Sequence, residues 1–281
     1  MYKAKESGKN TYVFYTKQMS HYQVDQFKLQ SHLKTAITDR QFVLHYQPQI
    51  DLTTNRIIGA EALIRWNHPQ MGMVSPMSFI PLAESSGLIV PIGQWVIEES
   101  CRQAVQWHKQ GLHITVAVNI SAIQFKRGNL VEIISNALNA SGINPAYLEI
   151  ELTESIMMHD VDATFQTVQA LKGLGVQLSI DDFGTGYSSL AYLKRFAVDK
   201  LKIDQSFVRD ILQDQEDAVI VSTIIQMAKS LNLKTIAEGV ESKEVLALIE
   251  DFGCDEVQGY YFAKPMEAFQ FEGYCGMTPI W

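Results

Sequence analysis

Short stretches in which apolar and polar residues alternate recur along most of the chain, and such alternation predicts β-strands. Between them lie longer stretches with apolar residues every three or four positions, which predict amphipathic helices. The eight predicted strands are Phe42–Ile50, Ile57–Trp66, His113–Ile120, Leu148–Leu152, Gln177–Ile180, Lys200–Ile203, Lys234–Ala237 and Glu256–Phe262. The predicted helices include Gly93–Lys109, Leu130–Ala140, Ala163–Leu174, Asp217–Leu231 and Lys243–Asp251.

This order of elements predicts an α/β fold, because strands that alternate with helices form strand–helix–strand units with a parallel sheet. Eight such strands in roughly 250 residues are typical of a TIM-like (β/α)8 barrel. The first two strands are an exception, since only residues 51–56 ("DLTTNR") connect them. A parallel crossover needs about a dozen residues, whereas an antiparallel pair accepts a short turn. We therefore expect an antiparallel first strand.

The N-terminal residues differ from the rest of the chain. Residues 1–15 ("MYKAKESGKNTYVFY") are interpreted as a short basic helical piece and one strand without a nearby partner. Residues 16–24 are interpreted as a linker that runs into a helix, and an amphipathic pattern extends over Gln18–Arg40. We expect residues 25–281 to form the barrel domain and residues 1–15 to be the tail of another domain.

Polar residues of the predicted strands share one parity, so they point to one face while the apolar residues point to the other. A half-exposed antiparallel sheet with its polar face toward water would explain this alternation. The intervening helices argue against it, because they must cover the apolar face of the sheet. The polar parity then points into the barrel, near the strand ends where active sites of such barrels lie. The residues of this parity include Glu61, Leu63, Arg65, Asn119, Glu149, Glu151, Asp181 and Lys202, with Glu149 placed deeper.

Buried carboxylates of like charge cost free energy unless a cation compensates them. Asp181 and Asp182 are adjacent, and the glycine-rich "FGTG" follows them, so the turn can bring both carboxylates to one side. Adjacent acids at a barrel mouth suit two metal ions that share a bridging ligand. No paired histidine spacing is present, so oxygen ligands dominate and favour hard ions such as Mg²⁺, Mn²⁺ or Ca²⁺.

The amino-acid composition limits which classes of protein this chain can belong to. The 281 residues carry a net charge of −8, which argues against binding long nucleic acid through a basic surface. Hydrophobic residues make up 47% and charged residues 19%, as in ordinary globular proteins. No apolar run long enough to span a membrane and no signal peptide are visible, and the three cysteines form no disulfide framework. We expect a cytoplasmic protein, whose parent chain could carry a membrane anchor.

Several motifs resemble, in order, those of EAL-domain cyclic-di-GMP phosphodiesterases, over roughly residues 27–271. The motifs are "HYQPQIDL", "EALIRW", "VNIS", "ELTES", "DDFGTGYSSL", "KLKID", "EGVE" and "QGYYFAKP". Residues 1–15 resemble the end of a GGDEF diguanylate cyclase domain without its signature, so we interpret the chain as a fragment of a tandem GGDEF–EAL protein. The resemblance implies a TIM-like barrel with an antiparallel first strand.

The resemblance also implies hydrolysis of cyclic-di-GMP to linear pGpG by a water that two Mg²⁺ or Mn²⁺ ions activate. It assigns metal ligands and catalytic residues, among which Lys202 orients or deprotonates the water and needs a lowered pKa to act as a base. Glu241 and Gln258 support the outer part of the site, and Glu154 braces the glycine-rich loop. The implied metal ligands are Glu61, Asn119, Glu151, Asp181, Asp182 and Glu238; the catalytic residues are Lys202, Glu238 and Glu241; the substrate contacts are Gln47, Leu63, Arg65, Asp204 and Gln258.

Three other functions stay open. A receptor that binds cyclic-di-GMP without cutting it is the main alternative, although every matched position is occupied. A Schiff-base aldolase could use Lys202 as an amine nucleophile, but it would not need the converging acids. A nonspecific nuclease is disfavoured by the acidic charge. Relatives often dimerise through the segment that corresponds to Asp182–Arg195, so a homodimer is expected.

Overall fold

The computed structural model describes residues 28–276 apart from residues 128, 159, 187–192 and 194. The predicted domain tail at residues 1–15 and the linker at residues 16–24 lie outside the described residues. Of the predicted helix Gln18–Arg40, residues 28–33 are helical, but residues 34–40 form turns. That part of the prediction was wrong. Three β-branched residues in "TAITDR" have low helix propensity, and Arg40 ends the segment with a left-handed φ of 53°.

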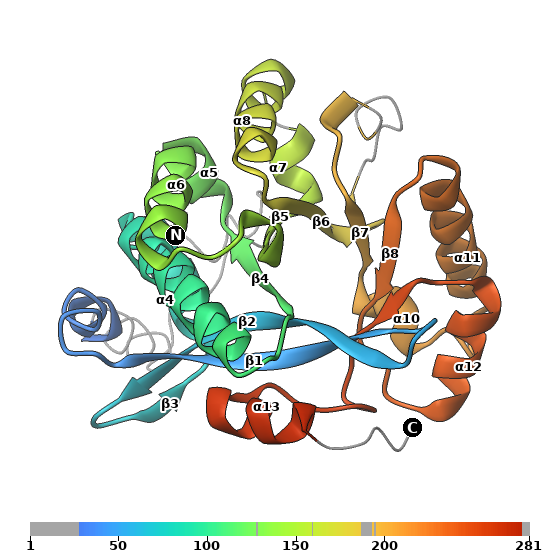
Figure 1. The fold of residues 1–281 in the computed structure, drawn as a ribbon, viewed down its shortest axis with the longest axis horizontal. Helices are drawn as coiled ribbons and strands as arrows, with labels where there is room; N and C mark the ends of the chain where they lie inside the picture. The colour runs from blue at the N-terminus through green and yellow to red at the C-terminus, as the bar shows by residue number, and fades with distance from the viewer. Residues whose placement is uncertain (1–27, 128, 159, 187–192, 194, 277–281) are drawn as a thin grey trace, which may run out of the picture.

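The sheet is a closed barrel, as expected (Figure 1). Strand β1 pairs antiparallel with both β2 and β9, whereas β2 and β4–β9 pair in parallel from neighbour to neighbour. All eight predicted strands are present, seven of them with small shifts at their ends. The eighth, predicted over Glu256–Phe262, ends at Val257, and residues 259–262 form a bend and turns instead, so that part of the prediction was wrong. The barrel strands are β1 (Phe42–Asp51), β2 (Arg56–His68), β4 (Thr115–Ile120), β5 (Leu148–Thr153), β6 (Gln177–Phe183), β7 (Lys200–Ile203), β8 (Lys234–Ala237) and β9 (Glu256–Val257).

Helices surround the barrel (Figure 1). The five predicted ones are present as α4 (Ile89–Lys109), α6 (Leu130–Ser141), α8 (Val161–Leu174), α11 (Gln215–Ser230) and α12 (Lys243–Phe252). Elements that the sequence pattern did not predict are mostly short. They are α3 (Pro76–Ser86), α5 (Ala122–Arg127), α7 (Glu154–Met158), α10 (Gln205–Arg209), α13 (Ala268–Cys275), the 3₁₀ turn Pro145–Tyr147, and the edge strands β3 (Gly72–Val74) and β10 (Met266–Glu267).

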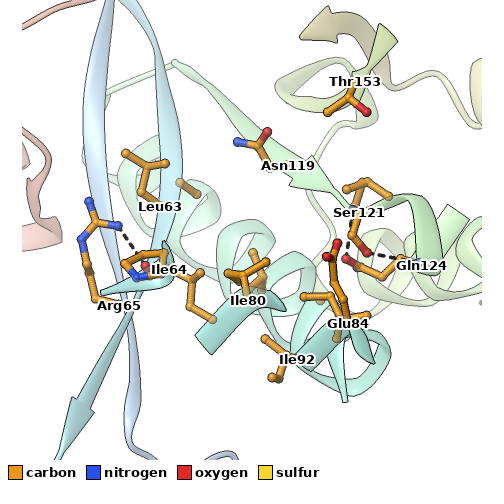
Figure 2. A pocket seen from close by; sticks show the side chains of 16 residues that line it. Leu63, Ile64, Arg65, Ile80, Glu84, Ile92, Asn119, Ser121, Gln124 and Thr153 are labelled. Atoms are coloured by element: carbon orange, nitrogen blue, oxygen red, sulfur yellow. Dashed lines mark hydrogen bonds between the residues drawn. The ribbon is translucent and has the colours of Figure 1, made fainter. Parts of the chain in front are cut away.

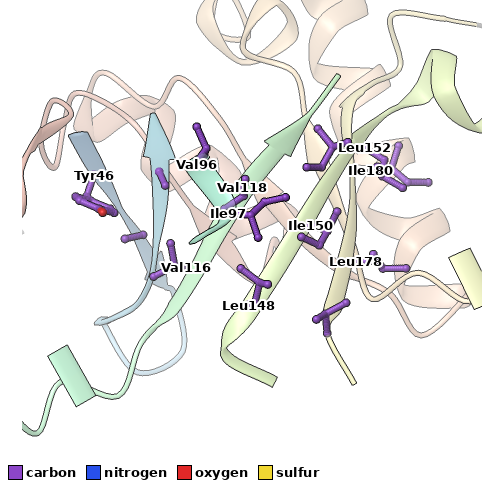
Figure 3. Close-up of a cluster of buried hydrophobic side chains, with 14 of the residues drawn as sticks. Tyr46, Val96, Ile97, Val116, Val118, Leu148, Ile150, Leu152, Leu178 and Ile180 are labelled. Atoms are coloured by element: carbon purple, nitrogen blue, oxygen red, sulfur yellow. The ribbon is translucent and has the colours of Figure 1, made fainter. Parts of the chain in front are cut away.

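The core lies between the outer face of the barrel and the helices (Figure 3). On β4 and β5 the apolar parity, such as Val116, Val118 and Ile150, is fully buried. In Figure 3 these side chains extend toward Val96 and Ile97 of α4. Because the apolar side chains of each strand pack outward against the helices, the alternating side chains between them point into the barrel. The parallel pairing excludes the half-exposed antiparallel sheet.

Among the described residues, none of the helices combines the length and the apolar character that crossing a membrane requires.

Candidate active site

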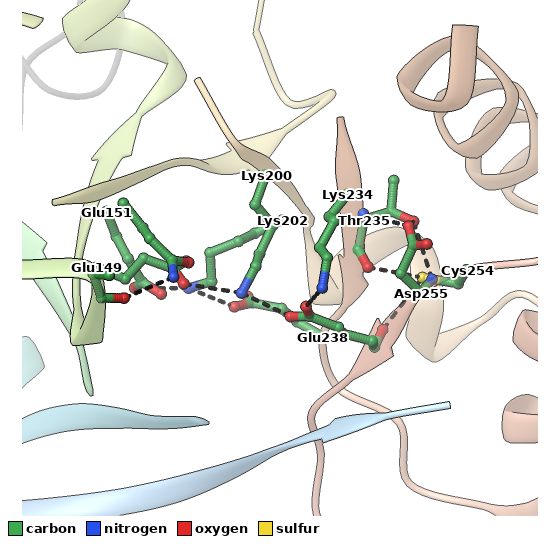
Figure 4. Close-up of polar contacts among 12 residues, drawn as sticks. Glu149, Glu151, Lys200, Lys202, Lys234, Thr235, Glu238, Cys254 and Asp255 are labelled. Carbon is green, nitrogen blue, oxygen red and sulfur yellow. Dashed lines mark hydrogen bonds and ion pairs between the residues drawn. The ribbon is translucent and has the colours of Figure 1, made fainter. Parts of the chain in front are cut away.

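The interior of the barrel holds a lysine surrounded by carboxylates, near the C-terminal ends of the strands. Lys202 of β7 is only 1% exposed, and its Nζ lies 2.8 Å from Glu151 of β5 and 3.0 Å from Asp181 of β6. Glu238, which follows β8, lies 2.7 Å from the same nitrogen, and Glu61 of β2 lies 3.9 Å away. Figure 4 shows Glu151 of β5, Lys202 of β7 and Glu238 after β8 converging. We call Lys202 and the four carboxylates around it the upper layer: Glu61, Glu151, Asp181, Lys202 and Glu238.

The upper layer carries an excess of negative charge. Four carboxylates face one ammonium group, and Asp182 adds another carboxylate beside them. Burial lowers and the carboxylates raise the pKa of Lys202, and the carboxylates prevail, so it lies well above its ordinary value. Burial raises the pKa of Glu151 despite the attraction of Lys202. Further cations would therefore stabilise the ionised upper layer.

Asp182 reaches the site through an irregularity in β6. Its φ is 54°, in the left-handed region, and the pairing of β6 with β7 shifts register between Ile180 and Phe183. The strand continues to Phe183, so Asp182 lies in a bulge inside the strand, whereas the sequence placed it where the strand breaks. A bulge interrupts the regular alternation of side chains. Burial, together with the charges of Asp181 and Asp204, raises the pKa of Asp182 to about 6.

Two amide side chains hold Glu61 in place. Asn119 of β4 donates a hydrogen bond of 2.7 Å to Glu61 Oε1, and Gln258 donates one of 2.5 Å to Glu61 Oε2. Gln258 also donates to Gln47 Oε1 at 3.0 Å, and Gln47 donates to the carbonyl of Ala263 at 3.1 Å. The structure thus brings together the predicted residues Gln47, Glu61, Asn119 and Gln258 through a continuous hydrogen-bond chain.

The upper layer opens into a polar cavity of about 290 Å³. Among its lining residues, Leu63, Arg65 and the exposed Glu241 were predicted to belong to the site. Arg65 donates to the carbonyl of Ile64 at 2.9 Å and forms no ion pair with any described residue. The sequence pattern did not single out several lining residues, because they come from loops and a short helix. They are Gln205, Arg209, Gly239, Gly259, Tyr260 and Pro265.

A second cavity of about 290 Å³ adjoins the first and is mostly apolar (Figure 2). It lies between β2, β4 and the helices α3 and α4, and Ile80 and Ile92 form part of its wall. Leu63 and Arg65 line both cavities, and Asn119 lines the second one from β4. This cavity could not be predicted from the sequence, since apolar helix residues ordinarily belong to the core.

Two predicted residues lie beside the upper layer rather than in it. Asp204 accepts hydrogen bonds from the backbone N–H (2.9 Å) and the hydroxyl of Ser206 at the start of α10. The charge of Asp204 also helps to raise the pKa of Asp182. Glu154 is buried, and its Oε2 accepts a hydrogen bond of 3.2 Å from the backbone N–H of Gly184. Glu154 therefore contacts the glycine-rich loop, where the sequence expected it.

Replacing Glu154 with alanine should reduce the free energy of unfolding by about 1.5–3 kcal/mol, because a buried hydrogen bond to a charged acceptor is lost. Urea unfolding measures this change. Glu250→Ala, at an exposed carboxylate of α12, is the control and should change stability by no more than about 0.5 kcal/mol. Equal stabilities of the two variants would contradict a bracing role for Glu154.

The donor atoms of the upper layer fit hard divalent cations. Carboxylate and amide oxygens are the ligands that Mg²⁺ and Mn²⁺ prefer. Glu151 Oε1 is buried and accepts no hydrogen bond from the described residues, so it is available as a ligand. In the described part of the chain, no three His, Cys, Asp or Glu side chains are already arranged around a common point as metal ligands. The carboxylates turn toward Lys202 instead, whose charge compensates them in part.

Comparison with known proteins agrees with this geometry. Residues 30–265 match the family described as EAL domain. The chain is 45% identical over 271 residues to the bifunctional diguanylate cyclase/cyclic di-GMP phosphodiesterase MucR of Pseudomonas aeruginosa, covering 96% of this chain but 40% of that protein. It is 40% identical over 272 residues to the cyclic di-GMP phosphodiesterase PdeR of Escherichia coli, covering 97% of this chain and 41% of PdeR.

Two solved structures extend the comparison. The PaMucR phosphodiesterase in complex with c-di-GMP has a TM-score of 0.84 at 46% identity, over 87% of this chain and 99% of that one. The FimX EAL domain from Pseudomonas aeruginosa bound to c-di-GMP has a TM-score of 0.78 at 28% identity, over 86% and 96% of the two chains. The chain thus spans about two fifths of its curated relatives MucR and PdeR, and it belongs to the EAL domain family.

Proposed function

We propose that this chain hydrolyses one phosphodiester bond of cyclic-di-GMP and releases linear pGpG. The observation that carries the proposal is the upper layer, in which four carboxylates and one lysine converge beneath an open polar cavity. The names of the relatives support the same reaction, since MucR and PdeR are described as cyclic di-GMP phosphodiesterases.

The charge of the site supports two divalent ions. When all carboxylates are ionised, the upper layer and Asp182 together carry a net charge of about −4, which two divalent cations would balance. Burial raises the pKa of Glu238 to about 8, so bound cations would have to displace its proton at neutral pH. Bound ions of this kind polarise a phosphoryl oxygen and lower the pKa of a bound water. Glu61, Asn119, Glu151 and Asp181 would hold one ion, and Asp181 and Asp182 the other. Glu238 would complete the set. Mg²⁺ and Mn²⁺ both suit these oxygen donors.

Lys202 would act as a protonated group that orients the attacking water. The surrounding carboxylates raise its pKa, and an ammonium group donates hydrogen bonds but accepts none. Deprotonating the water is the weaker assignment, because it requires the pKa to fall. The same protonation argues against a Schiff-base aldolase, which needs a neutral amine as nucleophile.

The two adjoining cavities suit a ligand with two bases and two phosphates. The apolar cavity offers aliphatic contacts for a base, and the polar cavity offers Arg65, whose guanidinium can form a forked contact to phosphate. Gln47, Leu63, Asp204 and Gln258 would complete the substrate contacts, while Glu241 would act from the cavity rim. A homodimer through Asp182–Arg195 remains a prediction, and part of that segment lies outside the described residues.

Metal affinity should depend on pH. The pKa of Asp182 is raised to about 6, so the metal-free site takes up a proton as the pH falls through 6, and a cation must displace it. Mn²⁺ should therefore bind more weakly as the pH is lowered from about 7.5 to 5, by up to about tenfold per pH unit for each proton displaced. Calorimetric titration at several pH values measures this. Constant affinity across the range would contradict the proposed role of Asp182.

Chromatography of nucleotides after incubation with cyclic-di-GMP tests the function. We expect pGpG in the presence of Mg²⁺ or Mn²⁺ and intact substrate in the presence of EDTA. Intact cyclic-di-GMP with either metal would overturn the proposal. If binding is nevertheless measured, the chain is a receptor; competition with single-stranded DNA separates both functions from a nonspecific nuclease.

A further inference from the structure

A second set of ion pairs lies inside the barrel below the upper layer (Figure 4). Lys200 Nζ lies 2.9 Å from Glu149 and 2.7 Å from Glu256, and Lys234 lies 3.2 Å from Glu256. The side chain of Lys200 is 6% exposed and those of both glutamates 1%, whereas Lys234 is 58% exposed. We call these four residues the lower layer. The proposed reaction uses none of them.

The two layers differ in charge balance. The lower layer pairs two lysines with two glutamates, so it is neutral, whereas the upper layer lacks positive charge. A neutral layer offers divalent ions little electrostatic attraction. The difference would direct cations to the upper layer.

The two layers are also close neighbours along the strands. Glu149 and Glu151 are two positions apart on β5, as are Lys200 and Lys202 on β7. Residues two apart on a strand point to the same side at a spacing of roughly 6.5–7 Å. Glu149 carries one buried oxygen, Oε1, that accepts no hydrogen bond from the described residues. Lys200 is thus the cation that engages Glu149 in this structure.

We propose that Lys200 is a positioning residue that, by pairing with Glu149, keeps Lys202 in the active site. While Lys200 pairs with Glu149, Lys202 remains with Glu151, Asp181 and Glu238. Without Lys200, the buried Glu149 carboxylate has no counter-ion, and the nearest lysine of the same strand is Lys202. Lys202 is then drawn toward the lower layer and away from the upper one. Glu256 stays paired through Lys234. This inference rests on the proposed function for its catalytic readout.

The test compares Lys200→Met with the double variant Lys200→Met/Glu149→Gln. The single variant leaves Glu149 unpaired, and the second substitution removes the carboxylate that competes for Lys202. We expect Lys200→Met to lower kcat roughly 10- to 100-fold with a smaller change in KM, since the water-orienting group is displaced. The double variant should recover most of this loss. Lys172→Met is the matched control, because Lys172 pairs with Asp199 away from the barrel interior.

Mn²⁺ affinity without substrate provides a readout that does not depend on turnover. The affinity should change in Lys200→Met, because Lys202 has moved, and return toward that of the wild type in the double variant. An unchanged kcat and Mn²⁺ affinity in Lys200→Met would overturn the proposal. A loss that Glu149→Gln does not recover, together with an equal loss of thermal stability, would assign Lys200 a structural role only and overturn it too. If the wild type fails to cleave cyclic-di-GMP, the proposed function fails, and the Mn²⁺ affinities alone decide the inference.

Discussion

Replacing Glu61 with glutamine should lower the rate of cyclic-di-GMP hydrolysis by roughly a thousandfold. The substitution keeps the size of the side chain but removes a charge from the proposed metal site, and a metal ion contributes several kcal/mol of transition-state stabilisation. It also places an amide group opposite Asn119 and Gln258, both of which now donate to the Glu61 carboxylate. Initial rates of pGpG formation at saturating Mg²⁺ measure the effect.

Glu132→Gln is a suitable control, because Glu132 is an exposed carboxylate on α6, remote from both cavities. Its rate should equal that of the wild type. A Glu61→Gln variant that kept more than about a tenth of the wild-type rate would contradict the assignment, because such a change corresponds to less than about 1.4 kcal/mol of transition-state stabilisation.

Replacing Lys202 with methionine should have the second large effect. In the absence of metal, the variant leaves the carboxylates of the upper layer without their ammonium partner, and breaking a buried ion pair in this way costs about 3–5 kcal/mol of stability. The raised pKa of Lys202 means that its stabilisation is fully present below a pH of about 10.5 and is lost only as the pH rises further. At neutral pH, Lys202→Met should therefore lose the whole of the stability that the protonated Lys202 contributes to the wild type.

Thermal unfolding with and without Mn²⁺ checks this prediction. Divalent ions compensate the same carboxylates, so Mn²⁺ should restore most of the lost stability in Lys202→Met, while hydrolysis remains lower by roughly a hundredfold because the water is no longer oriented. A Lys202→Met variant as stable as the wild type without metal would show that the upper layer does not depend on this lysine for its charge balance.

The barrel could be predicted because its strands are separated by helices and follow a regular alternation of side chains. The connection at residues 51–56 even predicted the antiparallel β1, since its length excludes a crossover. The edge strands β3 and β10 could not be predicted, because strands of three and two residues carry no periodicity. The predicted helix at residues 34–40 was wrong, since its apolar spacing suits a helix but packed turns bury Ala36 equally well.

Strand parity also located part of the site. It placed Glu61, Asn119, Glu151 and Lys202 in the barrel interior, because parallel strands present the same parity to the same side. Parity could not show that Lys202 takes the centre of the upper layer, since that depends on the lengths and rotamers of side chains from several strands. The cavity residue Arg209 comes from a short helix, where no period indicates direction. Tyr260 lies in a turn, although the sequence predicted it to be part of the eighth strand.

Counting the Mn²⁺ ions that the substrate-free protein binds at about pH 7.5, above the Asp182 pKa of about 6, tests most directly whether the upper layer is a two-ion site. Electron paramagnetic resonance distinguishes free from bound Mn²⁺ during the titration. The account predicts two bound ions in the wild-type chain and one in Asp182→Asn. The absence of bound ions in the wild type, or an unchanged count when both Glu61 and Asp182 are replaced by their amides, would contradict it.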